Sequence, residues 1–247
     1  MDQADTDGDT PLITAASSGD LKILRFLLQR GANMEIASAD GETALCIVTQ
    51  ESNTDAAALL IGHGAQLDAS SDDGMTPLML AVMLEDDEGM AQLLCTAGAN
   101  LHATDDSHET VLMKAAANSR SNSISRLITT GCNVNAQDIS GQTALHHCLR
   151  RDPEWEEALH AHVSILLQSG ADPNIQDVEG VNALHLAVQS SNVNMATLKL
   201  IADKITDVNT TDEDDRTALF YAVDNPEVEN DAVVELLLSR QADVNVR

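Results

Sequence analysis

DTDGDTPLITAASSGD, residues Asp5–Asp20, crowds aspartates around a glycine in the manner of a calcium loop. A helix–loop–helix calcium site needs a carboxylate at loop position one, glycine at position six and glutamate at position twelve. If Gly8 is the sixth residue, the first is Gln3 and the twelfth is Thr14, so both essential carboxylates are missing. We therefore interpret this stretch as part of the fold, with no metal role.

The pattern then returns along the whole chain, as DGETALCIV, DGMTPLMLA, SHETVLMKA, SGQTALHHC, EGVNALHLA and DDRTALFYA. Its anchoring residues are Thr10, Thr43, Thr76, Thr110, Thr143, Asn182 and Thr217, spaced 33, 33, 34, 33, 39 and 35 residues apart. A second signature follows most anchors: RGANM, HGAQL, AGANL, TGCNV and SGADP, blurred to ITDVN and QADVN in the last two units. Two motifs that recur in phase indicate an internal repeat of about 33 residues.

Each repeat has the local chemistry of a turn, a helix, a second turn and a second helix. The glycine before the anchor suits a tight turn with positive φ. The anchoring threonine can cap a helix, and Pro11 and Pro77 follow where a missing N–H does no harm. An alanine-rich helix is expected next. A leucine-rich helix then follows, such as LKILRFLLQR from Leu21, with Gly31 as its left-handed stop. Because one such unit cannot bury its apolar face alone, the units must stack.

The period and the T-P-L-H-x-A-like text closely resemble the ankyrin-repeat family over essentially the whole chain. The resemblance implies an all-α ankyrin-repeat solenoid of helix-turn-helix units with β-turn fingers. It implies a single ankyrin-repeat domain over residues 1–247. The expected units are approximately 5–37, 38–70, 71–104, 105–137, 138–176, 177–211 and 212–247.

The net charge of −27 argues against binding of nucleic acid or of an anionic membrane surface. It favours a basic partner, or simply high solubility. Between Arg30 and Lys114 there is no lysine or arginine, while the same span carries fifteen acids. The four cysteines form no C-x-x-C pair, and the acidic N-terminus is no signal peptide. We therefore expect an intracellular protein with reduced thiols, without a preference for cytoplasm or nucleus.

Ankyrin proteins bind partners through the turn tips and the exposed side of the first helix of each unit. Carried over to this chain, the resemblance places a nearly unbroken acidic ridge on the first four units. The partner-binding residues expected on this basis are Asp7, Asp9, Asp40, Glu42, Asp72, Asp73, Met75, Met83, Leu84, Asp106 and Glu109. The alternative is that these carboxylates form a merely solvated face.

Apolar residues interrupt the ridge. Met75, Met79 and Met83 are four residues apart, which would place them on one face of a helix. Met79, with Met113 in the next unit, is interpreted as a substitute for the usual buried histidine of the T-x-L-H text. Met75, Met83 and Leu84 are interpreted as exposed in the groove, where methionine suits peptide binding. The ridge and these residues together predict a Lys/Arg-rich peptide or protein partner with one apolar anchor.

The fifth unit has an insertion of about six residues within Arg150–Gly170, and it contains the chain's one tryptophan, Trp155. This side chain either forms a binding hot spot or packs over the neighbouring turn to close the longer loop. His146 and His185 occupy the T-A-L-H position, where the resemblance implies a structural hydrogen bond to the adjoining turn.

Four units end in an asparagine that resembles the hydroxylation sites of the family: Asn135, Asn174, Asn209 and Asn245. Each follows an aliphatic residue by eight positions. The alternative is a turn-forming asparagine that needs no modification.

The usual catalytic signatures are absent, and a shallow groove offers little of the enclosed site that catalysis needs. We therefore expect no enzyme activity and no cofactor, but a protein-interaction scaffold that binds a basic segment in an acidic concave groove. One alternative is a structural spacer array between flanking domains. Another is an inhibitor-type ankyrin protein that masks a basic segment of a transcription factor. Because the last helix, AVVELLLSR, leaves leucines without a following unit, we expect this sequence to be a fragment of a longer chain. We expect the solenoid itself to be monomeric.

Overall fold

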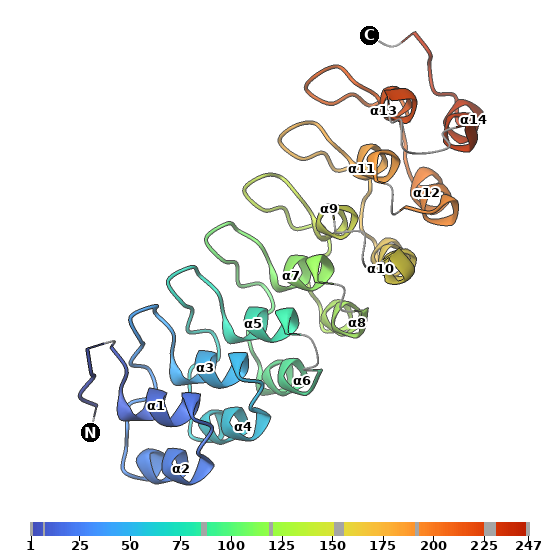
Figure 1. The fold of residues 1–247 in the computed structure, drawn as a ribbon. Coiled ribbons are helices and arrows are strands. Elements are labelled where there is room, and N and C mark those ends of the chain that lie inside the picture. Colours follow the sequence, from blue (N-terminus) through green and yellow to red (C-terminus); the bar gives the residue numbers. More distant parts are fainter. Residues whose placement is uncertain are drawn as a thin grey trace. The chain divides into compact units, whose positions relative to one another are not determined.

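The computed structural model describes residues 2–6, 8–84, 88–118, 121–150, 156–190, 193–224 and 231–245. The chain divides into two compact units, Met1–Val111 and Leu112–Arg247, and each is described by itself. Both units consist of α-helices joined by long, finger-like loops (Figure 1). The all-α class predicted from the repeat is therefore confirmed.

The helices come in pairs, a first and a second helix for every repeat of the sequence. The first helices are α1 (Pro11–Ser17), α3 (Ala44–Gln50), α5 (Pro77–Met83), α7 (Val111–Ala117), α9 (Ala144–Leu149), α11 (Ala183–Gln189) and α13 (Ala218–Asp224). The second helices are α2 (Leu21–Gln29), α4 (Thr54–Gly62), α6 (Glu88–Ala97), α8 (Ser121–Thr129), α10 (Glu156–Gln168), α12 (Met195–Ala202) and α14 (Asp231–Ser239). None of the helices in the described ranges is long and apolar enough to cross a membrane.

Within each unit the two kinds of helix form two layers. In the first unit α1 packs on α3 and α3 on α5, while α2 packs on α4 and α4 on α6. In the second unit the same arrangement joins α9 to α11 to α13, and α8 to α10 to α12 to α14. In Figure 1 the first helices lie next to the fingers, and the second helices lie on the side of the first helices that faces away from the fingers. The apolar core therefore lies between the two layers and between successive pairs.

The anchoring residues begin the first helices as the sequence predicts. The hydroxyl of Thr10 accepts the N–H of Ile13, and that of Thr76 accepts the N–H of Met79. Such a cap satisfies an N–H that would otherwise lack a partner at the start of the helix. The side chain of Asn182 caps α11 in the same way, so asparagine replaces threonine here without loss of the helix.

The second helices of the first five repeats and of the seventh are followed by a left-handed residue, whereas no residue with positive φ follows α12 in the sixth. In the first five repeats this residue is glycine, for example Gly31 with φ of 79° and Gly170 with φ of 92°. The seventh repeat has Gln241 at the same place with φ of 70°. The seventh repeat therefore lacks the glycine of the second signature, but the residue in its place still adopts the left-handed conformation that ends the helix.

Candidate protein-binding surface

Each finger is shaped by the residue five positions before the anchor. In the fourth finger Oδ1 of Asp105 accepts the backbone N–H of Ser107 at 3.0 Å and that of Glu109 at 2.8 Å. The second finger uses the Ser38 hydroxyl in the same role, with the N–H groups of Asp40 and Glu42 as donors. Asp105 is buried, so it builds the turn and does not belong to the exposed charges of the ridge.

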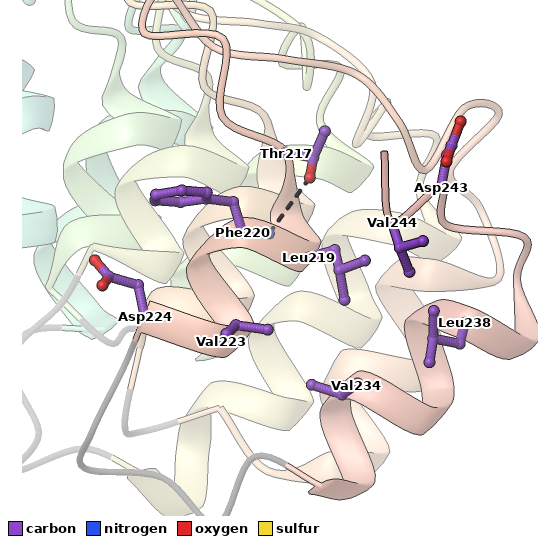
Figure 2. A pocket seen from close by; sticks show the side chains of 9 residues that line it. All are labelled: Thr217, Leu219, Phe220, Val223, Asp224, Val234, Leu238, Asp243 and Val244. Atoms are coloured by element: carbon purple, nitrogen blue, oxygen red, sulfur yellow. Dashed lines mark hydrogen bonds between the residues drawn. The ribbon is translucent and has the colours of Figure 1, made fainter. Parts of the chain in front are cut away.

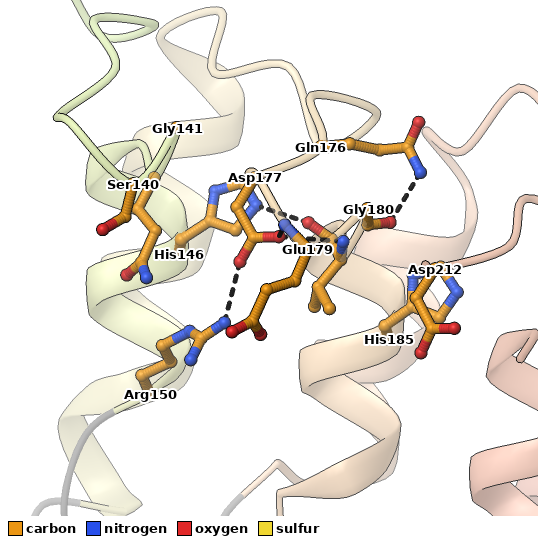
Figure 3. Close-up of polar contacts among 12 residues, drawn as sticks. Ser140, Gly141, His146, Arg150, Gln176, Asp177, Glu179, Gly180, His185 and Asp212 are labelled. Carbon is orange, nitrogen blue, oxygen red and sulfur yellow. Dashed lines mark hydrogen bonds and ion pairs between the residues drawn. The ribbon is translucent and has the colours of Figure 1, made fainter. Parts of the chain in front are cut away.

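The sixth and seventh fingers repeat this device with Asp177 and Asp212. Figure 3 shows Asp177, whose Oδ2 also forms an ion pair with a guanidinium nitrogen of Arg150, at a distance of 2.8 Å. Burial raises the pKa of Asp212. Hydrogen bonds from the Tyr221 hydroxyl and from the backbone N–H groups of Arg216 and Asp214 outweigh burial, so the pKa of Asp212 lies below its usual 3.8. The Asp212 carboxylate is therefore a charged structural group, and Asp177 builds its turn through the same pattern of hydrogen bonds.

Backbone hydrogen bonds hold neighbouring fingers side by side. In the first unit the N–H of Asp72 donates to the carbonyl oxygen of Asp40 at 3.2 Å, and the N–H of Asp106 donates to that of Asp73 at 3.3 Å. The second unit repeats the link, from Glu213 to Glu179 at 2.9 Å. The fingers are thus fixed in register inside each unit, and the side chains at their tips form a row.

The turn glycines make this close approach possible. Gly41 has φ of 73°, and a Cβ there would lie 2.6 Å from the backbone nitrogen of Asp72. A Cβ on Gly74 would lie 2.7 Å from the backbone nitrogen of Asp106. Real Cβ atoms do not come that close to backbone, so glycine is required by both the local turn and the neighbouring finger.

The predicted acidic residues of the first unit fall on this row to different degrees. Asp40, Asp72, Asp73 and Asp106 are exposed, and together they form what we call the acidic row. Three others are half-buried: Asp9, Glu42 and Glu109. Glu42 also accepts a hydrogen bond from the side-chain amide of Gln50. Asp7 lies outside the described residues.

The three methionines Met75, Met79 and Met83 do not lie on one helix face as their spacing predicts. Met75 precedes the capping residue Thr76, so it lies outside α5 and is half-buried. Met79 is buried in the core, as its interpretation as a histidine substitute requires. Met83 is 41% exposed at the end of α5, and Leu84 is half-buried just after it. Met83 is therefore the apolar side chain of this group that a partner can reach best.

The fifth-repeat insertion lengthens a second helix: α10 has 13 residues, against nine or ten in the second helices of the first four repeats. His162 is buried on this helix, and Nδ1 of His160 lies 2.9 Å from the hydroxyl of Thr197. Trp155 lies outside the described residues, so both interpretations of it stay predictions.

The carboxamides of the predicted hydroxylation sites bridge successive loops. Asn135 accepts the N–H of Asp172 at 2.8 Å and donates to the carbonyl oxygen of Gly170 at 3.0 Å. Asn174 and Asn209 make the corresponding bridges to the following loop. The side chain of Asn245 donates to the carboxylate of Asp243 within its own loop. These contacts give the asparagines a structural role, and hydroxylation of them stays a prediction.

The first two repeats have acids at the same place. A carboxylate oxygen of Glu35 accepts the N–H of Gln66, and one of Asp68 accepts the N–H of Asn100. Sequence reasoning missed this row of loop bridges because its residue type changes from acid to amide along the chain.

The histidines of the T-A-L-H position join neighbouring repeats. Nδ1 of His146 accepts the N–H of Thr143, and Nε2 lies 3.1 Å from the carbonyl oxygen of Val181 in the next finger (Figure 3). Nδ1 of His185 accepts the N–H of Asn182, and its Nε2 meets the carbonyl oxygen of Thr210. Burial lowers the pKa of both imidazoles from 6.5, so both are neutral and structural at pH 7.

Family models of known proteins match the chain along nearly its whole length. The model described as "Ankyrin repeats (3 copies)" matches residues 30–105, 87–177 and 156–247, and the model described as "Ankyrin repeat" matches residues 7–39. The chain belongs to the ankyrin-repeat family. The fold agrees with this assignment, because capped helix pairs joined by hydrogen-bonded fingers recur with the period of the family.

A solved ankyrin-repeat structure superimposes well on this one. It is the crystal structure of the ankyrin repeat domain of Bcl-3, described as a unique member of the IkappaB protein family. The TM-score is 0.77 and the sequence identity is 24%, over 94% of this chain and 99% of that one. At this identity the likeness shows the ankyrin-repeat solenoid fold alone. No curated protein matches the sequence. Membership of the ankyrin-repeat family supports a role as a protein-interaction scaffold.

Proposed function

We propose that this ankyrin-repeat chain binds a Lys/Arg-rich segment of a partner protein along the acidic row of its first unit. The observation that carries the proposal is the register of the fingers. Because the N–H of Asp72 bonds to Asp40 and that of Asp106 bonds to Asp73, the exposed carboxylates stand at fixed, successive positions. A partner with basic side chains at matching intervals would meet a preorganised surface.

The charge distribution favours such a partner. No lysine or arginine occurs between Arg30 and Lys114, so no base of that stretch neutralises the row. Each exposed ion pair contributes only about 0.2–1 kcal/mol, because water and salt screen it. Several pairs and an apolar contact are therefore needed for a specific complex. The row contributes mainly to the association rate and to partner choice.

Met83 is the apolar anchor point in this proposal. It ends α5, six residues beyond Pro77, which corresponds to about 9 Å along the helix axis. The partner segment would therefore place one aliphatic or aromatic side chain beyond its basic residues, over the end of the helix. Methionine suits this role because its unbranched side chain adapts to different shapes.

The experiment compares two triple charge reversals by titration calorimetry with Lys/Arg-rich peptides that carry one Leu or Phe. The test variant is Asp72→Lys, Asp73→Lys and Asp106→Lys. The matched control, with the same change in net charge, is Glu179→Lys, Glu213→Lys and Asp214→Lys, all exposed on the fingers of the second unit. We expect the test variant to lose at least tenfold in affinity, and the control to lose much less.

Two further measurements complete the test. Binding to the wild-type chain should weaken steadily between low and physiological salt, because the Debye length falls from about 30 Å at 0.01 M to about 8 Å at 0.15 M. Met83→Gln should weaken the binding of peptides that carry the Leu or Phe anchor. It should leave the binding of peptides without an anchor unchanged. Equal losses in both triple variants would mean that only bulk charge acts, and the proposed site would be wrong.

A further inference from the structure

The tips of the fifth and sixth fingers carry exposed aliphatic side chains. Ile139 is 61% exposed and Val178 is 60% exposed. Both occupy the position four before the anchor, where the third, fourth and seventh repeats expose Asp72, Asp106 and Glu213. Because turns ordinarily take polar residues or glycine, the two aliphatic tips depart from the pattern of the other repeats. We call Ile139 and Val178 the fingertip pair.

The exposure of the fingertip pair is not an effect of where the sequence begins or stops. Most other exposed large apolar side chains belong to the first helix pair or to the groove between α13 and α14 (Figure 2): Ile23, Phe26, Phe220, Val223, Leu238 and Val244. Those helix pairs have a neighbouring pair on one side only in this sequence, so we infer no binding site from their exposure. The fifth and sixth repeats have a repeat before and after them.

Hydrogen bonds hold the backbone of both fingertips in place. Oδ1 of Asp138 and Oδ1 of Asp177 each accept two backbone N–H groups of their own turn. The N–H of Val178 donates to the carbonyl oxygen of Ser140 at 2.9 Å, which joins the sixth finger to the fifth. Since Ser140 directly follows Ile139, this bond fixes the fingertip pair on adjacent, linked turns.

Glutamine side chains brace the same two fingers. Nε2 of Gln137 donates to the carbonyl oxygen of Gly141 at 2.8 Å and to that of Gln176 at 3.4 Å, so it connects the fifth finger to the sixth. Nε2 of Gln176 donates to Gly180 in its own finger (Figure 3) and to Thr211 in the next one. The other repeats have no glutamine at this place. The fingers with aliphatic tips are therefore the ones with these additional bonds, and their surface is preorganised for a partner.

The spacing of the two tips favours a helical partner. α9 packs on α11, and stacked helices lie about 8–10 Å apart, so equivalent residues of successive repeats are separated by about this distance. Residues i and i+7 of an α-helix lie on one face about 10.5 Å apart. Residues on one face of an extended strand are about 6.7 or 13.4 Å apart, which fits less well. Two aliphatic residues seven positions apart on a helix therefore match the fingertip pair.

The exposed charges beside the fingertip pair are negative. Glu179 and Glu213 are exposed on the sixth and seventh fingers, and within the described residues neither of them forms an ion pair. Three basic side chains that lie on or against these fingers each contact an acid: His147 with Asp138, Arg150 with Asp177, and Arg216 with Asp214. The two glutamates favour a partner with lysine or arginine, and they disfavour a second copy, which would bring the same acids together.

We propose that the fingertip pair binds an amphipathic helix of a partner protein. The helix carries two aliphatic residues seven positions apart, with lysine or arginine next to them. It lies across the tips of the fifth and sixth fingers, so that Ile139 and Val178 each contact one aliphatic side chain. Its bases face Glu179 and Glu213. This surface lies wholly in the second unit, and the proposal does not depend on binding to the acidic row.

Fluorescence anisotropy at physiological salt tests the proposal with labelled peptides of alanine and lysine, about 18 residues long and therefore able to form a helix. The test peptide has two leucines seven residues apart, on one helix face. The register control has the same composition with its leucines five residues apart, which places them about 140° apart around the helix. The chain carries Asp72→Lys, Asp73→Lys and Asp106→Lys throughout, so that the acidic row does not bind the lysines.

The test variant adds Ile139→Asp and Val178→Asp to this parent chain. Aspartate occupies the same position in the third and fourth repeats, so the variant should fold, and far-UV circular dichroism with thermal melting verifies that it does. The matched control adds Val223→Asp and Val244→Asp. It makes the same change in net charge and replaces two aliphatic side chains that are 70% and 71% exposed.

We expect the test peptide to bind the parent chain with a Kd of about 10–300 µM. The register control should bind at least tenfold more weakly, because only one of its leucines can reach the pair. The test variant should also lose at least tenfold in affinity, and the control variant less than about twofold. Glu179→Gln together with Glu213→Gln should weaken binding about twofold to tenfold, because each exposed ion pair contributes little.

Several results would overturn the proposal. One is the absence of binding up to about 1 mM peptide. Equal binding of the two peptides, or equal losses in the test and control variants, would show unspecific adhesion. Binding that does not change in the glutamine variant would contradict a basic partner. Sedimentation velocity of the parent chain alone provides the last criterion, because a dimer that the test variant abolishes would assign the fingertip pair to a second copy.

Discussion

The backbone N–H of Asp72 donates to the carbonyl oxygen of Asp40, and this single hydrogen bond of 3.2 Å sets the register of two adjacent fingers. The two residues are 32 positions apart in the sequence, yet their side chains belong to the same exposed row. The acidic row therefore depends on main-chain geometry at the turns as much as on the carboxylates themselves.

Gly41→Ala tests this dependence. Alanine at position 41 would have to adopt a left-handed backbone conformation, and its Cβ would lie 2.6 Å from the backbone nitrogen of Asp72. The conformation alone costs about 1–2 kcal/mol for a residue with a side chain. The steric conflict should add about 1–3 kcal/mol, because the fingers must move apart. Urea unfolding measures the sum.

Gly31→Ala is the matched control for this prediction. Gly31 has φ of 79°, and nothing lies within 4 Å of a Cβ built on it. Gly31→Ala should therefore lower the free energy of unfolding only by the cost of the left-handed conformation, without the steric cost. Equal destabilisation by the two alanines would show that the approach of Asp72 to Gly41 does not matter.

Acidification should destabilise the second unit through His146 and His185. Each imidazole accepts a backbone N–H at Nδ1, so each is neutral and carries its proton on Nε2. Burial lowers the pKa of both below the ordinary 6.5, so the unfolded chain binds protons first as the pH falls. Their contribution to stability is complete above pH 6.5. It decreases below that value, until the pH reaches the pKa of the folded state.

The double variant His146→Met and His185→Met isolates this effect. The chain already buries Met79 at the corresponding position of the third repeat, so the replacement has a precedent. The difference in free energy of unfolding between variant and wild type should be constant from pH 7 to 8. It should shift in favour of the variant between pH 6.5 and 5. A difference that does not vary with pH would contradict the neutral, buried state of the two rings.

The buried carboxylate of Asp177 should contribute more to the stability of the fold than its ion pair with Arg150 does. Its Oδ1 accepts the N–H groups of Glu179 and Val181, and its Oδ2 accepts the Arg150 guanidinium. Asp177→Ala leaves these donors without a partner, so we expect a loss of about 2–4 kcal/mol. Arg150→Ala should cost less than about 1.5 kcal/mol, because the arginine side chain is 38% exposed and the carboxylate keeps its N–H donors. Thermal unfolding of both variants checks the order, and a reversed order would be evidence against the turn-building role.

Most of the fold could be predicted from the sequence, because its signals are local. Thr10 and Thr76 cap their helices through their own hydroxyls, and glycine adopts a left-handed turn without cost. These requirements recur at the same places in each repeat, so the period alone indicates the helix pairs.

The candidate surface was harder to predict, because burial decides which acid a partner can reach. Asp105 and Asp106 are neighbours in the sequence, but one builds the turn and the other is exposed. The distance of five residues from the anchor would have marked the turn-building residue, since Ser38 and Asp177 share it. Met75 was misplaced for a related reason. A spacing of four predicts a common face only inside a helix, and Met75 precedes the helix cap.

Gln241→Gly should stabilise the last repeat. Gln241 has φ of 70°, and its N–H donates to the carbonyl oxygen of Leu238, as the N–H of Gly31 does to Leu28 in the first repeat. A left-handed glutamine is strained by about 1–2 kcal/mol, and glycine removes this strain but gains freedom in the unfolded chain. We expect a net gain of about 0.5–1 kcal/mol, measured by urea unfolding and by slower amide exchange in α14. Gln241→Ala keeps the strain and should bring no gain. If Gln241→Ala slowed amide exchange in α14 as much as Gln241→Gly does, the left-handed conformation at position 241 would not limit the stability of this repeat.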